Sequence, residues 1–150
     1  MDDDELSKFQ AWNPTIKAFK DVEKRTFMER FRPDRSENKM WYLNSGDSLS
    51  YNRIVFKDSL KTKSAFFNWL DHKSLSYFGA EENIQKDPIA ILYADTVIIT
   101  LSGSVDLNYW EDFFVEKEWL QDGDFWITQR KYGKARWRVF ANKELQELKE

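Results

Sequence analysis

The side chains best suited to catalysis lie in the segment Asp71-His72-Lys73, which holds the single histidine of the chain and precedes Ser74 and Ser76. A Ser-His-Asp triad needs such groups to converge from distant segments, and the GxSxG pattern of a nucleophile elbow does not occur in the sequence. A histidine near a helix C-terminus is also favoured simply as a cation. We therefore expect His72 to be an exposed helix residue rather than a catalytic base.

Metal and nucleotide chemistry have little support in the residue types. Asp58 followed by Asp71-His72-Lys73 has the outline of a nuclease site, in which two carboxylates hold a divalent metal and a lysine orients the nucleophile. That site requires a core strand, whereas this segment has the pattern of a helix end. The chain has no cysteine, and its five glycines form neither a GxGxxG nor a GxxxxGK loop. We expect no metal, no cofactor and no catalytic residue.

The densest group of candidate side chains is acidic. Residues 81–124 contain 11 acidic and 2 basic side chains, a net charge of −9 in a chain whose formal net charge is −3. Asp106 is a residue type that caps helices, and a helix over 106–117 places Asp112 and Glu116 one turn apart on its outer face. The calcium-loop spacing is not met around Asp122-Gly123-Asp124, and nothing marks one carboxylate as the proton donor of a glycosidase.

Carboxylates that surround aromatic side chains can instead recognise a basic protein surface, because they speed the encounter and fix the register of the complex. The other interpretation of this acidic stretch is a face that only keeps the protein in solution. The candidate partner-contact residues are Asp106, Trp110, Glu111, Asp112, Glu116, Glu118, Trp119, Asp122 and Asp124.

A basic hairpin follows the acidic stretch and offers an alternative function. Cations that contact phosphates and rings that stack on bases are typical of proteins that bind RNA or single strands. The neighbouring net charge of −9 would repel a polyanion, so we favour a solvated hairpin whose cations protect an edge strand or pair with the acidic stretch. The residues concerned are Arg130, Lys131, Tyr132, Lys134, Arg136, Trp137 and Arg138.

The periodicity of the apolar residues predicts the elements that position these groups. We expect helices over residues 2–12, 14–31, 60–72, 106–117 and 142–150, and strands over 50–56, 89–93 and 97–101 with a last hairpin over 125–140. Residues 32–39 read as loop, and residues 39–43 fit no single element. The prediction is one α+β domain over 1–150 with an acidic leader over 1–12, its N-terminal helices packed on a mostly antiparallel sheet of four or five strands.

The composition constrains the class of protein. Charged residues make up 33% of the 150 residues, yet aromatic residues reach 17% and include 7 tryptophans, which is unlike a disordered chain. The absence of cysteine fits a reducing compartment, and the acidic start MDDDELSKFQ lacks the basic and apolar regions of a signal peptide. No apolar run is long enough to span a bilayer. We expect a cytoplasmic protein with no membrane partner.

The C-terminal third resembles small bacterial immunity proteins, which neutralise toxins delivered by contact-dependent or related secretion systems. The matching stretch is VIITLSGSVDLNYWEDFFVEKEWLQDGDFWIT followed by ARWRVF, with the layout strand, tryptophan-containing helix, acidic turn and hairpin. The resemblance implies a cytoplasmic protein without catalysis of its own that occludes the active site of a toxin.

The sequence therefore predicts a protein-binding inhibitor whose acidic, aromatic surface covers a basic toxin domain. Two alternatives remain open. One is a nucleic-acid-binding protein that uses the hairpin of residues 130–138. The other is a carboxylate-based hydrolase, which would need two close carboxylates in a cleft, one of them with a raised pKa.

Overall fold

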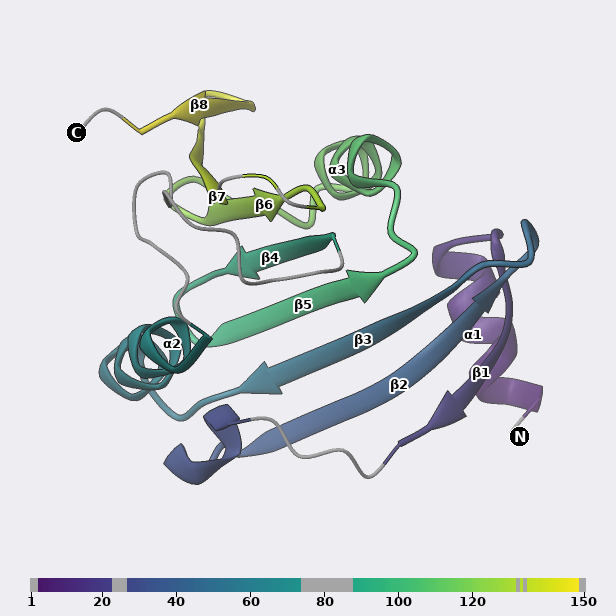
Figure 1. The fold of residues 1–150 in the computed structure, drawn as a ribbon, viewed down its shortest axis with the longest axis horizontal. Helices are drawn as coiled ribbons and strands as arrows, with labels where there is room; N and C mark the ends of the chain where they lie inside the picture. Colours follow the sequence, from purple (N-terminus) through teal and green to yellow (C-terminus); the bar gives the residue numbers. More distant parts are fainter. Residues whose placement is uncertain (1–2, 23–26, 74–87, 132, 134, 149–150) are drawn as a thin grey trace.

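The computed structural model describes residues 3–22, 27–73, 88–131, 133 and 135–148, drawn in Figure 1. The helices are α1 (Asp3–Trp12), the short 3-10 helix η1 (Phe27–Phe31), α2 (Ser59–Lys73) and α3 (Leu107–Glu116). The strands are β1 (Ile16–Asp21), β2 (Arg35–Leu43), β3 (Ser48–Val55), β4 (Ile89–Tyr93), β5 (Val97–Gly103), β6 (Phe125–Gln129), β7 (Ala135–Ala141) and β8 (Glu144–Glu147).

The strands form a single eight-stranded sheet in the order β1-β2-β3-β5-β4-β6-β7-β8, and every neighbouring pair is antiparallel. The prediction of four or five strands is wrong. The additional strands are β1, β2 and β8. Strand β1 replaces the start of the helix predicted at 14–31, and β8 replaces part of the helix predicted at 142–150. Strand β2 covers most of the predicted loop 32–39 and the segment 39–43, which fitted no single element. Strands therefore predominate in the part of the chain that the structure describes.

A β-bulge explains why the first strand has the sequence pattern of a helix. Ile16 and Phe19 both point into the core although they are three residues apart, a spacing typical of a helix. In the pairing of β1 with β2, Ile16 lies opposite Leu43 and Ala18 lies opposite Tyr42, so the register shifts between them. The additional residue of the bulge changes the two-residue alternation of a strand into a spacing of three.

The other segments follow the predicted pattern more closely. The strand predicted at 50–56 is β3, the helix predicted at 60–72 is α2, and the two hairpins are β4–β5 and β6–β7. The leader helix is α1. Helix α3 follows Asp106 as predicted.

The sheet buries a hydrophobic core on each face. Along the central strands, alternate residues point to opposite cores: Ile98 belongs to the core under α2 and η1, and Ile99 to the core under α1 and α3. We call these two sides of the sheet the α2 face and the α3 face. Trp41 on the α3 face is fully buried and stacks on Tyr51 with ring centroids 4.2 Å apart. The mean hydropathy of −0.72 is low for a protein with a hydrophobic core, and the large aromatic side chains supply much of that core.

Candidate functional site

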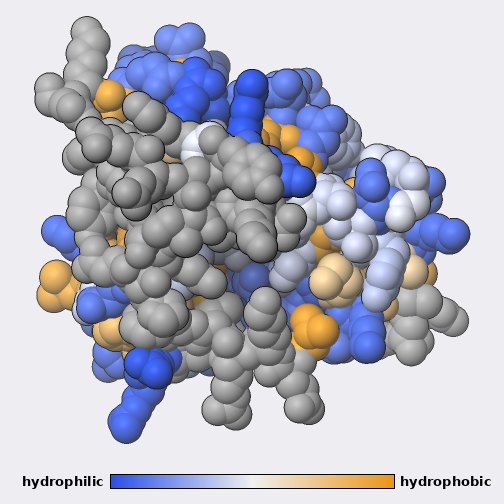
Figure 2. Space-filling model, viewed as in Figure 1, coloured by the Kyte–Doolittle hydropathy of each residue, from blue (hydrophilic) through white to orange (hydrophobic). Residues whose placement is uncertain are grey.

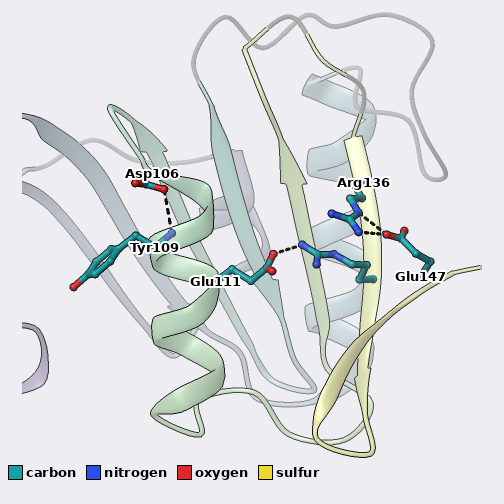
Figure 3. Close-up of polar contacts among 6 residues, drawn as sticks. Asp106, Tyr109, Glu111, Arg136 and Glu147 are labelled. Atoms are coloured by element: carbon teal, nitrogen blue, oxygen red, sulfur yellow. Dashed lines mark hydrogen bonds and ion pairs between the residues drawn. The ribbon is translucent and has the colours of Figure 1, made fainter.

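Helix α3 lies on the α3 face and begins at the predicted N-cap. The Asp106 carboxylate accepts a hydrogen bond from the backbone N–H of Tyr109 at 3.0 Å, as Figure 3 shows. Trp110, Phe113 and Phe114 lie on one side of the helix and are buried against the sheet. Residues on the other side of α3 therefore face solvent.

The helix ends in a hydrogen-bonding pattern that places Trp119. Glu118 adopts the left-handed conformation with φ of 58°, and its N–H bonds to the carbonyl of Val115 at 3.2 Å. The N–H of Trp119 bonds to the carbonyl of Phe114 at 3.0 Å, which completes a Schellman motif. The ring of Trp119 packs edge-on against Phe114 and also against Trp12, with centroids 5.4 Å apart in the second pair. Trp119 nevertheless remains partly accessible, since 38% of the residue is exposed.

Exposed carboxylates flank this tryptophan in the sequence at Glu116, Glu118 and Asp122, with the exposed Lys117 among them. Asp112 and Glu116 lie one turn apart on the solvent side of α3, as predicted. Within the described ranges, no cation forms an ion pair with the carboxylates of this surface. We define the acidic surface as the exposed residues Asp112, Glu116, Glu118, Trp119 and Asp122.

Other predicted contact residues have structural positions instead. Trp110 is 1% exposed and belongs to the core, so it cannot serve as a contact residue as predicted. Asp106 uses its carboxylate to cap α3. Glu111 points toward β7 and forms an ion pair with Arg138 (Figure 3). The basic hairpin therefore neutralises one residue of the acidic stretch within the same chain.

Asp124 is half-buried in the turn before β6. Its carboxylate accepts a hydrogen bond from the N–H of Gln121 at 2.9 Å. Burial raises the pKa of Asp124 above its ordinary value, the hydrogen bond from Gln121 lowers it, and the negative charge of Asp95 raises it further. The net direction is upward, so the charged form of Asp124 is disfavoured in the folded protein.

The basic hairpin consists of β6, β7 and their connection. Arg138 is 6% exposed and Arg136 pairs with Glu147 on β8 (Figure 3). Trp137 points to the α2 face and is buried, so it cannot stack on a base as the nucleic-acid hypothesis requires. Tyr132 and Lys134, which belong to the same hypothesis, lie outside the described residues.

Two hollows border α3. A small cleft of about 180 Å³ lies between the start of α3 and the hairpin, and we call it the arginine cleft because Arg130, Arg136 and Arg138 line it. A wider groove of about 900 Å³ crosses the ends of β2, β3 and β5, with Ser50 and Ser102 paired across neighbouring strands at its floor. Residues of intermediate hydropathy colour this end of the molecule pale in Figure 2. Sequence patterns could not predict either hollow, because each is lined by residues from segments that are far apart in the chain.

The structure gives no support to the catalytic patterns. Asp58 accepts a hydrogen bond from the backbone N–H of Lys61 at 2.8 Å and so caps α2 rather than holding a metal. The side chain of His72, together with Ser74 and Ser76, lies outside the described residues. Among the residues that are described, no group of three or more histidine, cysteine, aspartate or glutamate side chains could hold a metal ion.

Comparisons with known proteins gave no match. No protein-family model, no curated protein and no solved structure matches the chain. None of the helices in the described ranges combines the length and the apolar character needed to cross a bilayer.

Proposed function

We propose that the protein is a cytoplasmic, protein-binding inhibitor that docks a basic partner on its acidic surface. The observation that carries this proposal is the partial exposure of Trp119, flanked in the sequence by exposed carboxylates that have no ion-pair partner in the described part of the chain. Tryptophan is the residue type most enriched at the energetic centres of interfaces. Unpaired carboxylates around it supply the charge complementarity that selects a basic partner.

The geometry also limits the cost of binding. The Schellman motif and the packing of Trp119 on Trp12 hold the indole in one orientation before a partner arrives. A side chain that is already ordered loses little conformational entropy on association. The resemblance of the C-terminal third to immunity proteins favours a toxin domain as the partner, and the absence of cysteine favours the cytoplasm.

A capture experiment with matched variants tests this proposal. Wild-type protein would be used as bait in a lysate of the native host, next to Asp112→Lys/Glu116→Lys and a control of equal charge change, Asp34→Lys/Asp95→Lys. We expect the wild type and the control to retain one stoichiometric basic protein and the acidic-surface variant to lose it.

Calorimetry on the isolated pair then gives the magnitude. We expect the Asp112→Lys/Glu116→Lys variant to weaken binding by about tenfold or more, and Trp119→Ser by roughly thirtyfold, the loss typical of a hot-spot residue. Circular dichroism serves as the control for folding. Equal affinities for the wild type and both variants would contradict the proposal.

A further inference from the structure

The arginine cleft has a composition that the docking of a basic protein does not explain. Thr128 on β6 pairs with Arg136 on β7, and Trp126 pairs with Arg138, so these side chains share the α3 face of the sheet. Arg130 follows two residues after Thr128. The first turn of α3 lies above them and adds Asn108 to the lining. Three arginine residues thus line the cleft beside the start of a helix.

The positive charge of the cleft is only partly neutralised within the chain. Among the described residues, Glu111 is the one carboxylate in the lining, and it pairs with Nη2 of Arg138. Arg136 pairs with Glu147, which lies on β8 and is not part of the lining. Arg130 is exposed and forms no ion pair with any residue that the structure describes. The lining therefore carries an excess of cations.

Two polar groups beneath the cleft have unused hydrogen-bonding capacity. Thr128 is 7% exposed, and its hydroxyl makes no hydrogen bond to any residue in the described ranges. Arg138 is 6% exposed, and its Nε is buried without an acceptor in the same part of the chain. Buried polar groups in folded proteins nearly always have partners. The unpartnered Nε of Arg138, with Thr128 in the lining beside it, fits a ligand rich in acceptor oxygens.

The volume of the cleft restricts the ligand further. At about 180 Å³ it is smaller than the pockets that enclose drug-sized molecules, which measure roughly 300–1,000 Å³. A tetrahedral oxyanion fits this space, while an attached nucleoside or sugar would remain outside it.

We propose that the arginine cleft binds the phosphoryl group of a small phosphorylated molecule. Arg130 supplies the free guanidinium, Thr128 a hydroxyl donor, and Arg136 and Arg138 the surrounding positive field. Guanidinium groups suit this ligand because their planar donors match the oxygens of a phosphate. The site is independent of the proposed function, because it lies on the hairpin side of α3 and its test needs no protein partner.

The proposal is tested by titrating the full chain with inorganic phosphate and, separately, with ribose 5-phosphate at constant ionic strength. Amide chemical shifts of residues around Thr128, Asn108 and Arg130 report occupancy of the cleft. We expect saturable shifts there with at least one of the two ligands. Saturation with inorganic phosphate alone would identify the free ion as the ligand, and tighter binding of ribose 5-phosphate would identify a phosphate ester.

Two mild variants separate a built site from diffuse attraction. Thr128→Val removes a donor without changing charge or shape, and Arg130→Gln removes the free cation. We expect each to weaken binding by about tenfold, the loss typical of a charge-assisted hydrogen bond, while the control Arg35→Gln on β2 changes it less than about twofold.

Three outcomes would overturn the proposal. The first is the absence of saturable shifts with either ligand. The second is equal affinity of the wild type and Thr128→Val, since the signal would then reflect charge attraction alone. The third is binding of single-stranded polynucleotide but of neither small phosphate, with a steep dependence on salt that Arg130→Gln reduces, which would favour the nucleic-acid hypothesis.

Discussion

At the residue scale, the ionised carboxylate of Asp124 destabilises the folded state. Burial and the charge of Asp95 disfavour its ionised form, and the hydrogen bond from Gln121 offsets only part of this effect. Its pKa is therefore higher in the folded than in the unfolded protein. At a pH between the unfolded and the folded pKa of Asp124, folding takes up a proton. The free energy of unfolding therefore falls as the pH rises from the lower pKa to the higher one.

The variant Asp124→Asn removes this cost while keeping an acceptor for Gln121. We expect it to be more stable than the wild type at neutral pH and equally stable below the ordinary carboxyl value of 3.8, where the aspartate is protonated in both states. Urea unfolding at a series of pH values measures the difference. Asp122→Asn, which removes the same charge from an exposed position, is the control. A stability difference that does not change with pH would refute this account.

Residue types alone could predict the capping by Asp106 and the shared outer face of Asp112 and Glu116, because both follow from local helix geometry. They could not separate Trp110 from Trp119. Both tryptophans stand among carboxylates in the sequence, and only the packing of α3 on the sheet buries the first and leaves the second accessible. The pairing of Glu111 with Arg138 joins residues 27 positions apart and likewise depends on the fold.

At the scale of the element, strand β8 shows how tertiary pairing overrides local preference. Its residues Glu144–Glu147 are mostly good helix formers, which is why the sequence predicts a helix there. The chain instead turns at Asn142 and Lys143, which have φ of 53° and 65°, and pairs with β7. Two left-handed residues between antiparallel strands match the turn type that suits the twist of a hairpin. The usual signal, glycine in the second position, is missing from this turn.

This geometry predicts that Lys143→Gly stabilises the protein. The left-handed conformation costs a residue with a Cβ roughly 1–2 kcal/mol, and glycine loses part of that gain through its greater freedom in the unfolded chain. We expect a net increase in the free energy of unfolding of about 0.5–1 kcal/mol, measured by urea denaturation.

Lys143→Ala is the matched control, since alanine also removes the charge but keeps the Cβ. It should be no more stable than the wild type. If alanine and glycine stabilised the protein equally, the effect would come from charge and not from the backbone of the turn.

At the scale of the whole molecule, the sheet joins two hydrophobic cores that have no side chain in common. Neighbouring residues such as Ile98 and Ile99 extend from the same strand into different cores. The sequence pattern of β5 could not show this arrangement, because its first residues, Val97–Ile99, form a continuous apolar run with no alternation to detect. Loss of packing on one face should therefore loosen the strands, and with them the packing of the core on the opposite face.

A probe confined to one face can test this coupling. In the variant Trp69→Phe/Trp137→Phe, the tryptophans that remain belong to the α3 face or pack against its core. Adding Leu70→Ala creates a cavity on the α2 face, which should cost about 2–5 kcal/mol. We expect tryptophan fluorescence and circular dichroism to report the same shift, about 1–2 M lower in urea.

Leu60→Ala on the same helix is the control, because Leu60 is 78% exposed and its removal should change stability by less than about 0.5 kcal/mol. A fluorescence transition that stays in place while circular dichroism shifts would mean that the two layers unfold separately. Coincident shifts would show that the eight strands transmit the loss of one core to the other, since the two core clusters share no side chain among the residues that the structure describes. The expected result is thus a single cooperative transition, in which residues on both faces of the sheet depend on the same backbone hydrogen bonds.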